Sequence, residues 1–446
     1  MTVVSTLFSC VMLAVTLTRK SILMMRTRPK ETITQSVTTM TASLMAPTSA
    51  MQNVSSAMTI SSNVSLPLTL TTPMSGLPSV TVTASTASFS PRPSPILPSS
   101  NLASVFVDGG TGKDGWGILI WQDGAGSLSF VHGGSELKGQ GRIEDVLEDA
   151  PKAKDGTPMA AVADDTSVAH LFYLDESDAI SHVFTKSGGG WKRGGLSRGR
   201  KRTAAHSKSM LSAAFHQGEH DTRVVVLSYQ SPDGNLRLTM SEDPKNDDEW
   251  YTVDFNSFAG RRGIGDWGGI GHAIAGDWQN KRQDPDGSFS GLLMAVEEGE
   301  EITPWECSVD FHASSKKQAE CHVLGKTFSD SSGRGISISS RANQFAWVRT
   351  GHGKSKAPAE TLPYEFAFLC VDSEGIIREN RVGIDVARIS GPGINVDMSF
   401  DSFAANSNKT VYAKSGNNVV AFRLDADGWQ WKVDGFVNTT IPDTSP

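Results

Sequence analysis

The fold is decided by a unit that reads LSAAFHQ at residues 211–217, VVVLSYQSPDGNLRLTM at 224–240 and tryptophan at 250. It opens with a short strand of small and apolar residues. A second strand, a turn and a third strand follow, because Pro, Asp and Gly favour tight turns between strands. No window of twelve residues in this part of the chain has a convincing helical period. The unit therefore predicts β structure.

The same opening recurs at intervals of roughly 50 to 65 residues, which is the signature of a repeat architecture. The copies, of which the last two are weaker, are LASVFVD (102–108), MAAVADD (159–165), LSAAFHQ (211–217), HAIAGDW (272–278), GISISSR (335–341) and NVDMSFD (395–401). Propeller blades converge at an axis where only slim side chains fit, so six units predict an all-β, six-bladed β-propeller. A β-sandwich is the alternative. Five or seven blades stay open, because GHGKSKAPAE (351–360) interrupts the fifth unit.

The first 100 residues differ from the rest in composition. Residues 1–18 carry no charged side chain, and their apolar run is typical of a signal peptide or a membrane anchor. Residues 19–100 are expected to form a disordered Ser/Thr/Pro-rich stalk, since 29 of residues 31–100 are Ser or Thr and 8 are Pro. We assign residues 101–446 to the propeller head.

The location of the head is indicated by two features that conflict. Sequons begin at Asn53 and Asn63 in the stalk and at Asn408 and Asn438 in the head. With the stalk, they favour a head that is extracellular or at the cell surface, attached to a membrane if the N-terminal segment is retained. The basic residues between 19 and 30 favour the opposite orientation by the positive-inside rule, so a cytosolic head is the alternative.

Charge and cysteine usage exclude some functions. The formal net charge is −7, and residues 101–446 hold 35 basic against 47 acidic side chains. Nucleic acid is therefore not expected as a partner. No Cys or His cluster has zinc spacing, and we expect no metal or other cofactor. Cys307 and Cys321 could form a disulfide within one repeat, or these two and Cys370 are buried thiols.

The order of small first strand, aromatic second strand, Asp-Gly turn, third strand and tryptophan resembles the fungal fucose-specific lectins with a six-bladed propeller. SYQSPDGNL (228–236) is the best local match, and the resemblance extends over about residues 102–435. The apolar N-terminus, the TRKS junction (18–21) and the stalk look like membrane-tethered members of this kind. The resemblance implies a sugar site between blades. There an Arg on the second strand and a Glu on the third bind hydroxyls, and an aromatic residue stacks on the ring.

Those positions can be transferred to this chain one repeat at a time. Repeat two has His170, His182 and Trp191, which form the best candidate pocket. In the other repeats the family residues are mostly replaced. The positions are Val226, Leu238 and Trp250 in repeat three, Ala367 and Glu379 in repeat five, and Thr410, Ala421 and Trp429 in repeat six. The candidate carbohydrate-binding residues are therefore His170, His182, Trp191, Trp250, Glu379 and Trp429.

Three functions are consistent with this pattern. The first is carbohydrate binding without turnover, with fucose as a candidate sugar and glycans or glycoproteins as partners. The second is a non-catalytic interaction propeller that has lost its sugar sites. The third is a glycoside hydrolase built on aspartates near the ends of the first strands, which requires two carboxyl groups close together. Those aspartates are Asp108, Asp164, Asp277 and Asp401, and they could instead cap turns.

Overall fold

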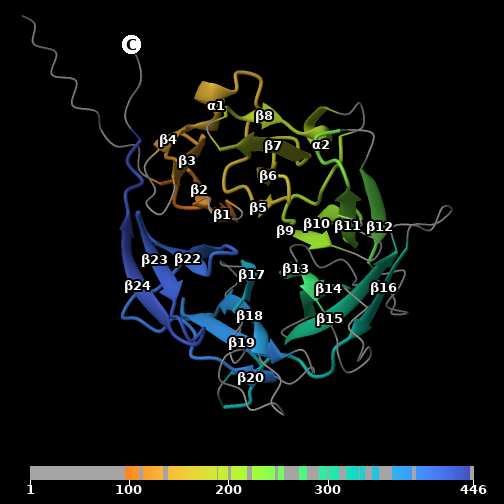
Figure 1. Ribbon diagram of the computed structural model, residues 1–446, viewed down its shortest axis with the longest axis vertical. Helices are drawn as coiled ribbons and strands as arrows, with labels where there is room; N and C mark the ends of the chain where they lie inside the picture. Colours follow the sequence, from red (N-terminus) through yellow and green to blue (C-terminus); the bar gives the residue numbers. More distant parts are fainter. Residues whose placement is uncertain are drawn as a thin grey trace, which may run out of the picture. The chain divides into compact units, whose positions relative to one another are not determined.

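The computed structural model describes residues 96–109, 114–133, 139–187, 189–198, 202–217, 223–246, 250–255, 271–278, 291–298, 301–310, 318–330, 332–336, 344–350, 364–383 and 388–441. All of them lie in the second of two compact units, Ser85–Pro446. The expected N-terminal apolar segment and the stalk up to residue 95 lie outside the described residues. Within the described part, six antiparallel sheets of four strands surround a central axis (Figure 1). The prediction of an all-β, six-bladed propeller is confirmed.

Each blade is a meander of four consecutive strands. Blade one contains β1 (Leu102–Val107), β2 (Trp116–Gln122), β3 (Leu128–Gly133) and β4 (Gly139–Arg142), followed by α1 (Ile143–Val146). Blade two contains β5 (Met159–Ala163), β6 (Val168–Leu174), β7 (Ile180–Lys186) and β8 (Lys192–Arg193), followed by α2 (Gly195–Arg198). Blade three contains β9 (Leu211–Gln217), β10 (Arg223–Gln230), β11 (Leu236–Ser241) and β12 (Tyr251–Asp254).

The other three blades repeat this order. Blade four contains β13 (His272–Trp278), β14 (Gly291–Glu298), β15 (Glu301–Asp310) and β16 (Gln318–Val323). Blade five contains β17 (Phe345–Arg349), β18 (Tyr364–Val371), β19 (Ile377–Gly383) and β20 (Arg388–Ser390). Blade six contains β21 (Ser402–Ala405), β22 (Thr410–Ser415), β23 (Asn418–Leu424) and β24 (Trp431–Val437).

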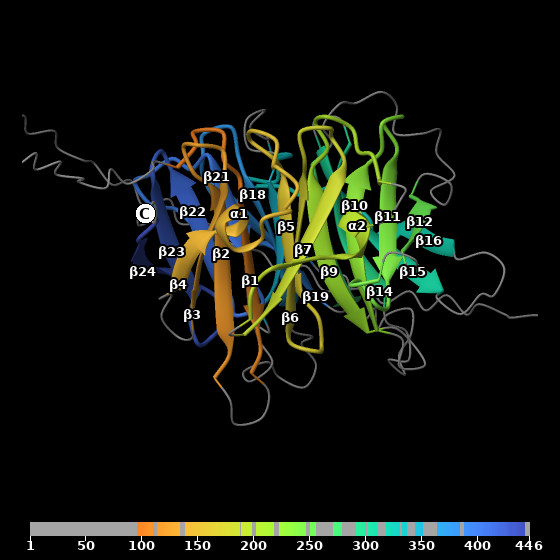
Figure 2. The ribbon, with the colours of Figure 1, turned by 90° about the horizontal axis from the view of Figure 1, so that it is seen from above.

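The first strand of every blade lines the axis, and the later strands lie progressively further out (Figures 1 and 2). Neighbouring first strands pack side by side around the ring, and β21 packs beside β1. The ring closes through side chains of blades one and six. Asn406 donates a hydrogen bond to Ser104 Oγ at 2.9 Å, and Ile96 shares an apolar cluster with Tyr412 and Ile441. Residues 96–100, which we placed at the end of the stalk, thus pack against the propeller.

A hydroxyl group two residues before the first strand fixes the entry to three of the blades. Ser100 Oγ, Thr157 Oγ1 and Ser209 Oγ each accept a hydrogen bond from a backbone N–H at the end of the second strand, at 2.8 Å in every case. The first strand does not extend far enough to pair with this N–H. The hydroxyl supplies a partner for a buried donor that would otherwise be costly to leave unpaired.

The expected starts of repeats five and six are wrong. The first strands are β17 and β21, which begin ten and seven residues later than GISISSR and NVDMSFD. Residues 337–341 of the first segment lie outside the described residues. The second segment is a connection in which Phe400 is buried and its N–H bonds to the Gly375 carbonyl at 2.8 Å. Its apolar residues pack over the junction of blades five and six, which explains why it resembles a strand in sequence.

The cysteines divide into one pair and one single thiol. Cys307 on β15 and Cys321 on β16 lie directly opposite each other and form a disulfide. Cys370 on β18 is a buried free thiol, and burial raises its pKa. The first of the two alternatives for these cysteines is therefore the one in the structure, with the cross-link holding the outer strands of blade four together.

Candidate functional site

The closing tryptophan of a blade faces the blade before it. The Trp191 ring meets Phe130 of blade one edge to face, with centroids 5.6 Å apart. Trp250 of blade three meets Phe172 of blade two in the same way at 5.8 Å. Trp429 of blade six lies 4.4 Å from the Arg381 guanidinium of blade five. These three inter-blade sites therefore take their aromatic residue from the following repeat.

This arrangement corrects the pocket expected from His170, His182 and Trp191. The two histidines are together, with His170 Nδ1 and His182 Nε2 3.0 Å apart. His182, however, stacks on Phe172 on the side of blade two that faces blade three, and Trp250 contacts it there. Trp191 packs on the opposite side, toward blade one. Successive side chains of a strand point to opposite faces, so residues of one repeat need not share a pocket.

The histidine pair belongs to a buried chain that starts at Asp164. Asp164 Oδ2 lies 3.2 Å from His170 Nε2, and both rings have no exposed surface. An ionised Asp164 accepts a hydrogen bond from His170 Nε2–H, and the two imidazole rings share one further hydrogen bond. Burial alone would raise the pKa of Asp164, but hydrogen bonds from His170 and from Val168 N–H hold it below its usual value. Burial, with His170 and Arg198 nearby, lowers the pKa of His182 well below its usual value, so this ring is neutral.

The cleft over these histidines is filled by the segment that contains α2. A Cβ atom on Gly194 would lie only 2.0 Å from His182 Nδ1, so glycine allows the chain to cross directly over the ring. Ser197 Oγ donates to the His182 carbonyl at 2.9 Å, and Leu196 is buried beneath. Gly195 N–H bonds to the Pro244 carbonyl of blade three at 3.0 Å. The described residues thus close this cleft, and His170 and His182 have no contact with solvent.

Glu379 and Trp429 come together between blades five and six. Glu379 Oε1 pairs with Arg381 Nη2 at 2.7 Å, and the guanidinium lies over the Trp429 ring. The Arg, Glu and aromatic residue types of the resemblance therefore meet here, but the Arg comes from the third strand and the Trp from the next blade. Burial raises the pKa of Glu379, while the Arg381 guanidinium opposes the shift.

The same three residues are sealed in this conformation. Neither charged side chain has exposed surface. Arg381 donates to the carbonyls of Gly428 and Trp429, and Glu379 Oε2 accepts from Gly393 N–H at 3.0 Å. With these polar groups already bonded inside the protein, the arrangement stabilises the junction of the two blades and offers no open ligand site.

The open cleft lies between blades one and two, where Trp191 is found. It is a cavity of about 420 Å³ between β2 and β3 of blade one and the end of β7 in blade two. Trp116, Phe130 and Trp191 supply aromatic surface. Its polar side chains are those of Asp114, His132, Thr185, Lys186 and Ser187, and all of these residues except Thr185 are exposed.

Two glycines on β4 shape one wall of this cleft. Gly141 lies opposite Phe130 and Gly139 opposite His132 in the β3–β4 pairing. A Cβ atom on Gly139 would lie 2.7 Å from the His132 ring. The rings of Phe130 and His132 therefore occupy the space that side chains of β4 would otherwise fill. Phe130 and His132 are stacked at 16° with centroids 5.6 Å apart. Phe130 and Trp191 are each 6% exposed, so most of the aromatic surface open to the cleft belongs to His132 and to the partly exposed Trp116. The ring of His132 is partly shielded from water by its neighbours, and this desolvation lowers its pKa, so the ring is neutral near pH 7.

The aspartates near the first strands do not assemble a carboxylate pair. Asp108 and Asp164 follow their strands, and Asp277 is the second-last residue of β13, but Asp401 precedes β21 and so lies at the opposite end. Among the described residues that line the 330 Å³ axial cavity at the Asp277 end, Asp277 is the single carboxylate. Asp164 accepts from Thr166 N–H and Val168 N–H at 2.9 Å, which is the turn-capping role.

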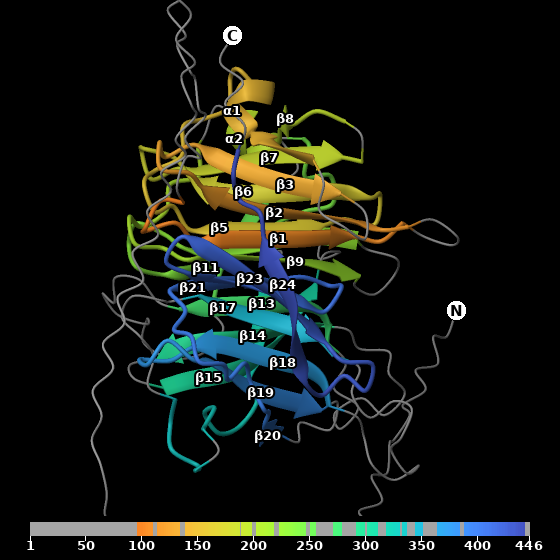
Figure 3. The same cartoon turned by 90° about the vertical axis from the view of Figure 1, so that its left-hand side faces the viewer.

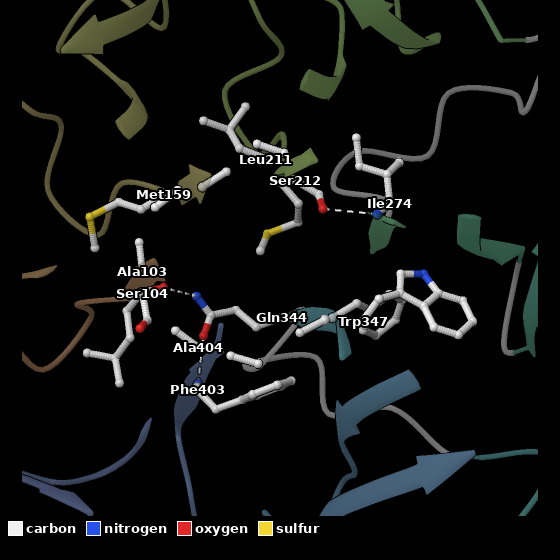
Figure 4. Close-up of a pocket in the computed structure, with 18 of the residues that line it drawn as sticks. Ala103, Ser104, Met159, Leu211, Ser212, Ile274, Gln344, Trp347, Phe403 and Ala404 are labelled. Carbon is white, nitrogen blue, oxygen red and sulfur yellow. Dashed lines mark hydrogen bonds between the residues drawn. The ribbon is translucent and has the colours of Figure 1, made fainter. Parts of the chain in front are cut away.

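The axis narrows at its other end, where a cavity of about 100 Å³ remains. Gln344 crosses between blades there, as Figure 4 shows. Its amide nitrogen donates to the Leu102 carbonyl at 3.4 Å, and its oxygen accepts from Phe403 N–H at 2.7 Å. Ser212 Oγ accepts from Ile274 N–H at 3.0 Å on the far side. The polar groups at this end are thus used to join blades.

Several features of the clefts were missed in the sequence. Arg381 was missed because the Arg was sought on the second strand, although a residue two positions after Glu379 on the same strand shares its face. Phe130 and His132 were missed because nothing in the sequence pairs them with the glycines of β4. Among the described residues, no group of three His, Cys, Asp or Glu side chains could hold a metal ion. In the same residues we find no helix with the length and apolarity needed to span a membrane.

Comparison with known proteins shows a shared fold. No protein-family profile and no curated protein sequence matches this chain. A fucose-specific lectin from Aleuria aurantia superimposes with a TM-score of 0.53 at 14% identity, covering 79% of this chain and 100% of that one. AofleA from Arthrobotrys oligospora gives 0.52 at 13% identity, covering 77% and 88%. The SapL1 lectin, solved with alpha-methyl fucoside, gives 0.51 at 13% identity, covering 77% and 97%. The chain is thus similar in fold to six-bladed fucose-binding lectins.

Proposed function

We propose that this propeller binds carbohydrate, without turnover, in the cleft between blades one and two. The observation that carries the proposal is the open cavity of about 420 Å³ with Trp116, Phe130 and Trp191 on its walls. Its volume lies in the range of small-molecule sites. Its position between blades is the one that the resemblance to fucose-specific lectins implies for a sugar.

The chemistry of the cleft suits a neutral sugar. A pyranose has faces of C–H groups that pack on aromatic rings, and hydroxyls at its rim that need donors and acceptors. The exposed His132 ring, backed by Phe130, and the partly exposed Trp116 serve the first need. Asp114 accepts, Lys186 donates, and neutral His132 can do either. Since the cleft combines one carboxylate with one ammonium group, it has no excess charge that would favour an acidic ligand.

Fucose is the first sugar to test. The Aleuria aurantia lectin is described as fucose-specific, and the SapL1 lectin was solved with a fucoside. The cleft lacks their implied Arg and Glu pair, so hydroxyl recognition would depend on Asp114, His132 and Lys186. We therefore expect selectivity for fucose to be weaker than in those lectins, or directed to another sugar. An array that contains several glycans tests this expectation.

The experiment is a glycan array with the full chain, followed by titration with the best sugar. We expect His132→Ala and Lys186→Ala each to weaken binding about tenfold, the loss of one or two hydrogen bonds. Both side chains are exposed, so the fold should survive, which thermal melting checks. His322→Ala and Lys432→Ala remove the same side chains from exposed sites on other blades and should bind like the wild type.

Two results would contradict the proposal. Binding that persists in the His132 and Lys186 variants would place the sugar elsewhere on the molecule. A blank array from a folded, monodisperse chain would favour the non-catalytic interaction propeller, with protein partners in place of glycans.

A further inference from the structure

The outer strand of blade six carries an exposed aromatic residue that packing does not explain. Phe436 on β24 is 71% exposed, more than any other large hydrophobic side chain in the described residues. β24 pairs with β23 on one side only and forms the rim of its blade, as Figure 3 shows. An apolar residue on an edge strand invites edge-to-edge association, so proteins usually cover or charge such strands.

Exposure alternates from the end of β24 into the residues that follow it. Exposure is high at Phe436, Asn438 and Thr440 and lower at Val437 and Thr439. Alternate residues of an extended chain share a face. The aromatic ring, the Asn amide and the Thr hydroxyl are therefore presented together on one solvent-facing side. Thr440 N–H also donates to Asn438 Oδ1 at 3.0 Å, which orients the amide.

We propose that Asn438 is an N-glycosylation site and that its first N-acetylglucosamine covers Phe436. Asn438-Thr439-Thr440 is an acceptor sequon. In the transfer, Asn438 Nδ2 bonds to C1 of the sugar and loses one proton. The C1–O bond to a lipid diphosphate donor breaks, and the lipid diphosphate leaves. The donor and the transferase are those of a secretory compartment and are not part of this chain.

The physical gain comes from the ring two residues before the acceptor. A sugar on Asn438 lies on the same face as Phe436, so its C–H surface can pack on the ring and remove apolar area from water. The glycan also blocks the unpaired edge of β24 with a bulky, hydrated group. The modification thus accounts for the exposed ring, and at the edge of β24 it adds to the protection that the exposed Lys432 and Asp434 give.

The other sequon in the head lacks these features. Asn408 is exposed in the turn between β21 and β22, with Asn406 two residues before it. Asn406 Oδ1 accepts from Asn408 N–H at 3.1 Å, and Thr410 of that sequon is buried. The position two residues before this sequon holds Asn406, so no aromatic residue stands where Phe436 stands before Asn438. Asn408 is therefore the internal comparison for Asn438.

The test is to express the full chain in a eukaryotic host with an added cleavable signal peptide. The signal peptide directs the chain to the transferase independently of its own N-terminal segment. We expect peptide mass mapping to find glycan on Asn438, with Asn438→Gln abolishing it. Enzymatic removal of the glycan should lower the melting temperature by about 2 °C in the wild type, through loss of the ring–sugar contact. An unmodified Asn438 in the secreted chain would overturn the proposal.

The role of the ring is tested with Phe436→Ala. In this variant, removal of the glycan should no longer change the melting temperature. Val433→Ala, which truncates another exposed apolar side chain of β24, should keep the full effect. If deglycosylation shifts the Phe436→Ala protein as much as the wild type, the sugar does not pack on Phe436, and that part of the proposal is wrong. The proposal would also be contradicted if loss of a glycan at Asn408 lowered the melting temperature more than loss of the glycan at Asn438.

Discussion

At the scale of single residues, the ion pair of Glu379 and Arg381 makes the stability of the propeller sensitive to substitution. Both side chains are fully buried. Arg381→Leu would leave the Glu379 carboxylate without a counter-charge, and we expect a loss of about 3–5 kcal/mol in unfolding free energy at pH 7. Glu379→Gln combined with Arg381→Leu should be less damaging than Arg381→Leu alone. Chemical denaturation measures both, and equal losses would contradict the prediction.

The pH dependence of the Arg381→Leu variant follows from the same pair. Burial already raises the pKa of Glu379, and loss of the guanidinium raises it further. A carboxyl group whose pKa is higher in the folded state takes up its proton earlier on acidification in that state. The stability deficit of the variant should therefore shrink as the pH falls from 7 toward 5. A deficit that stays constant over this range would show that Glu379 is not the cause.

His182 gives a second residue-scale prediction, with the opposite sign. Its pKa is lowered by burial and by nearby His170 and Arg198, so the unfolded chain binds a proton that the folded chain does not. Below about pH 6.5, the usual His value, this group should cost about 1 kcal/mol of stability per pH unit. His182→Phe keeps a ring beside Phe172 and Trp250 and should flatten the slope between pH 7 and 5. The exposed His322→Phe should leave it unchanged, and equal slopes in all three proteins would refute the assignment.

At the scale of elements, Gly194 decides whether α2 can close the cleft between blades two and three. Its missing Cβ would stand 2.0 Å from His182 Nδ1, and the ring is held between Phe172 and Trp250. Gly194→Ala should therefore cost about 1–3 kcal/mol, the range of overpacking. Gly190→Ala, four residues earlier, meets nothing within 4 Å and is the matched control. Thermal melting that ranks the two variants alike would contradict this account.

The elements also show what a sequence can predict. The small first strands of blades one to four lie where the pattern places them, because crowding at the axis restricts those positions to slim side chains. The connection before β21 has a similar alternation for another reason, since Phe400 is buried between two blades. A pattern of burial therefore cannot distinguish a strand at the axis from a connection packed on the side of a blade.

At the scale of the whole molecule, the order of the repeats was predictable and the pairing of their faces was not. Trp191 belongs to repeat two in sequence but forms its site with Phe130 of blade one. Likewise Trp429 of blade six completes the group around Glu379 of blade five. Both tryptophans were identified from the sequence, but the blade that each one contacts was not. Which face of a blade meets its neighbour is set by the closed ring, so the sequence of a single repeat does not show which blade its tryptophan contacts.

Ring closure gives the last prediction. Each blade takes all four strands from consecutive sequence, so no strand is exchanged between blades one and six. Closure must then depend on side chains, and Ile96 is central because it is 2% exposed and packs among residues of both blades. Beside it, the buried Lys414 donates to the Pro98 carbonyl at 3.0 Å. Ile96→Ala should cost about 2–4 kcal/mol, as for other large aliphatic core residues.

The matched control is Val146→Ala, which truncates a half-exposed side chain on α1 of blade one and should cost under about 0.5 kcal/mol. A chain that begins at Asn101 should behave like Ile96→Ala or worse, because it lacks Ile96 and the Pro98 carbonyl together. Denaturant unfolding compares the three with the full chain. If the chain beginning at Asn101 unfolded at the wild-type midpoint, residues 96–100 would be part of the stalk after all. The remaining contacts between β21 and β1 would then suffice to hold the ring closed.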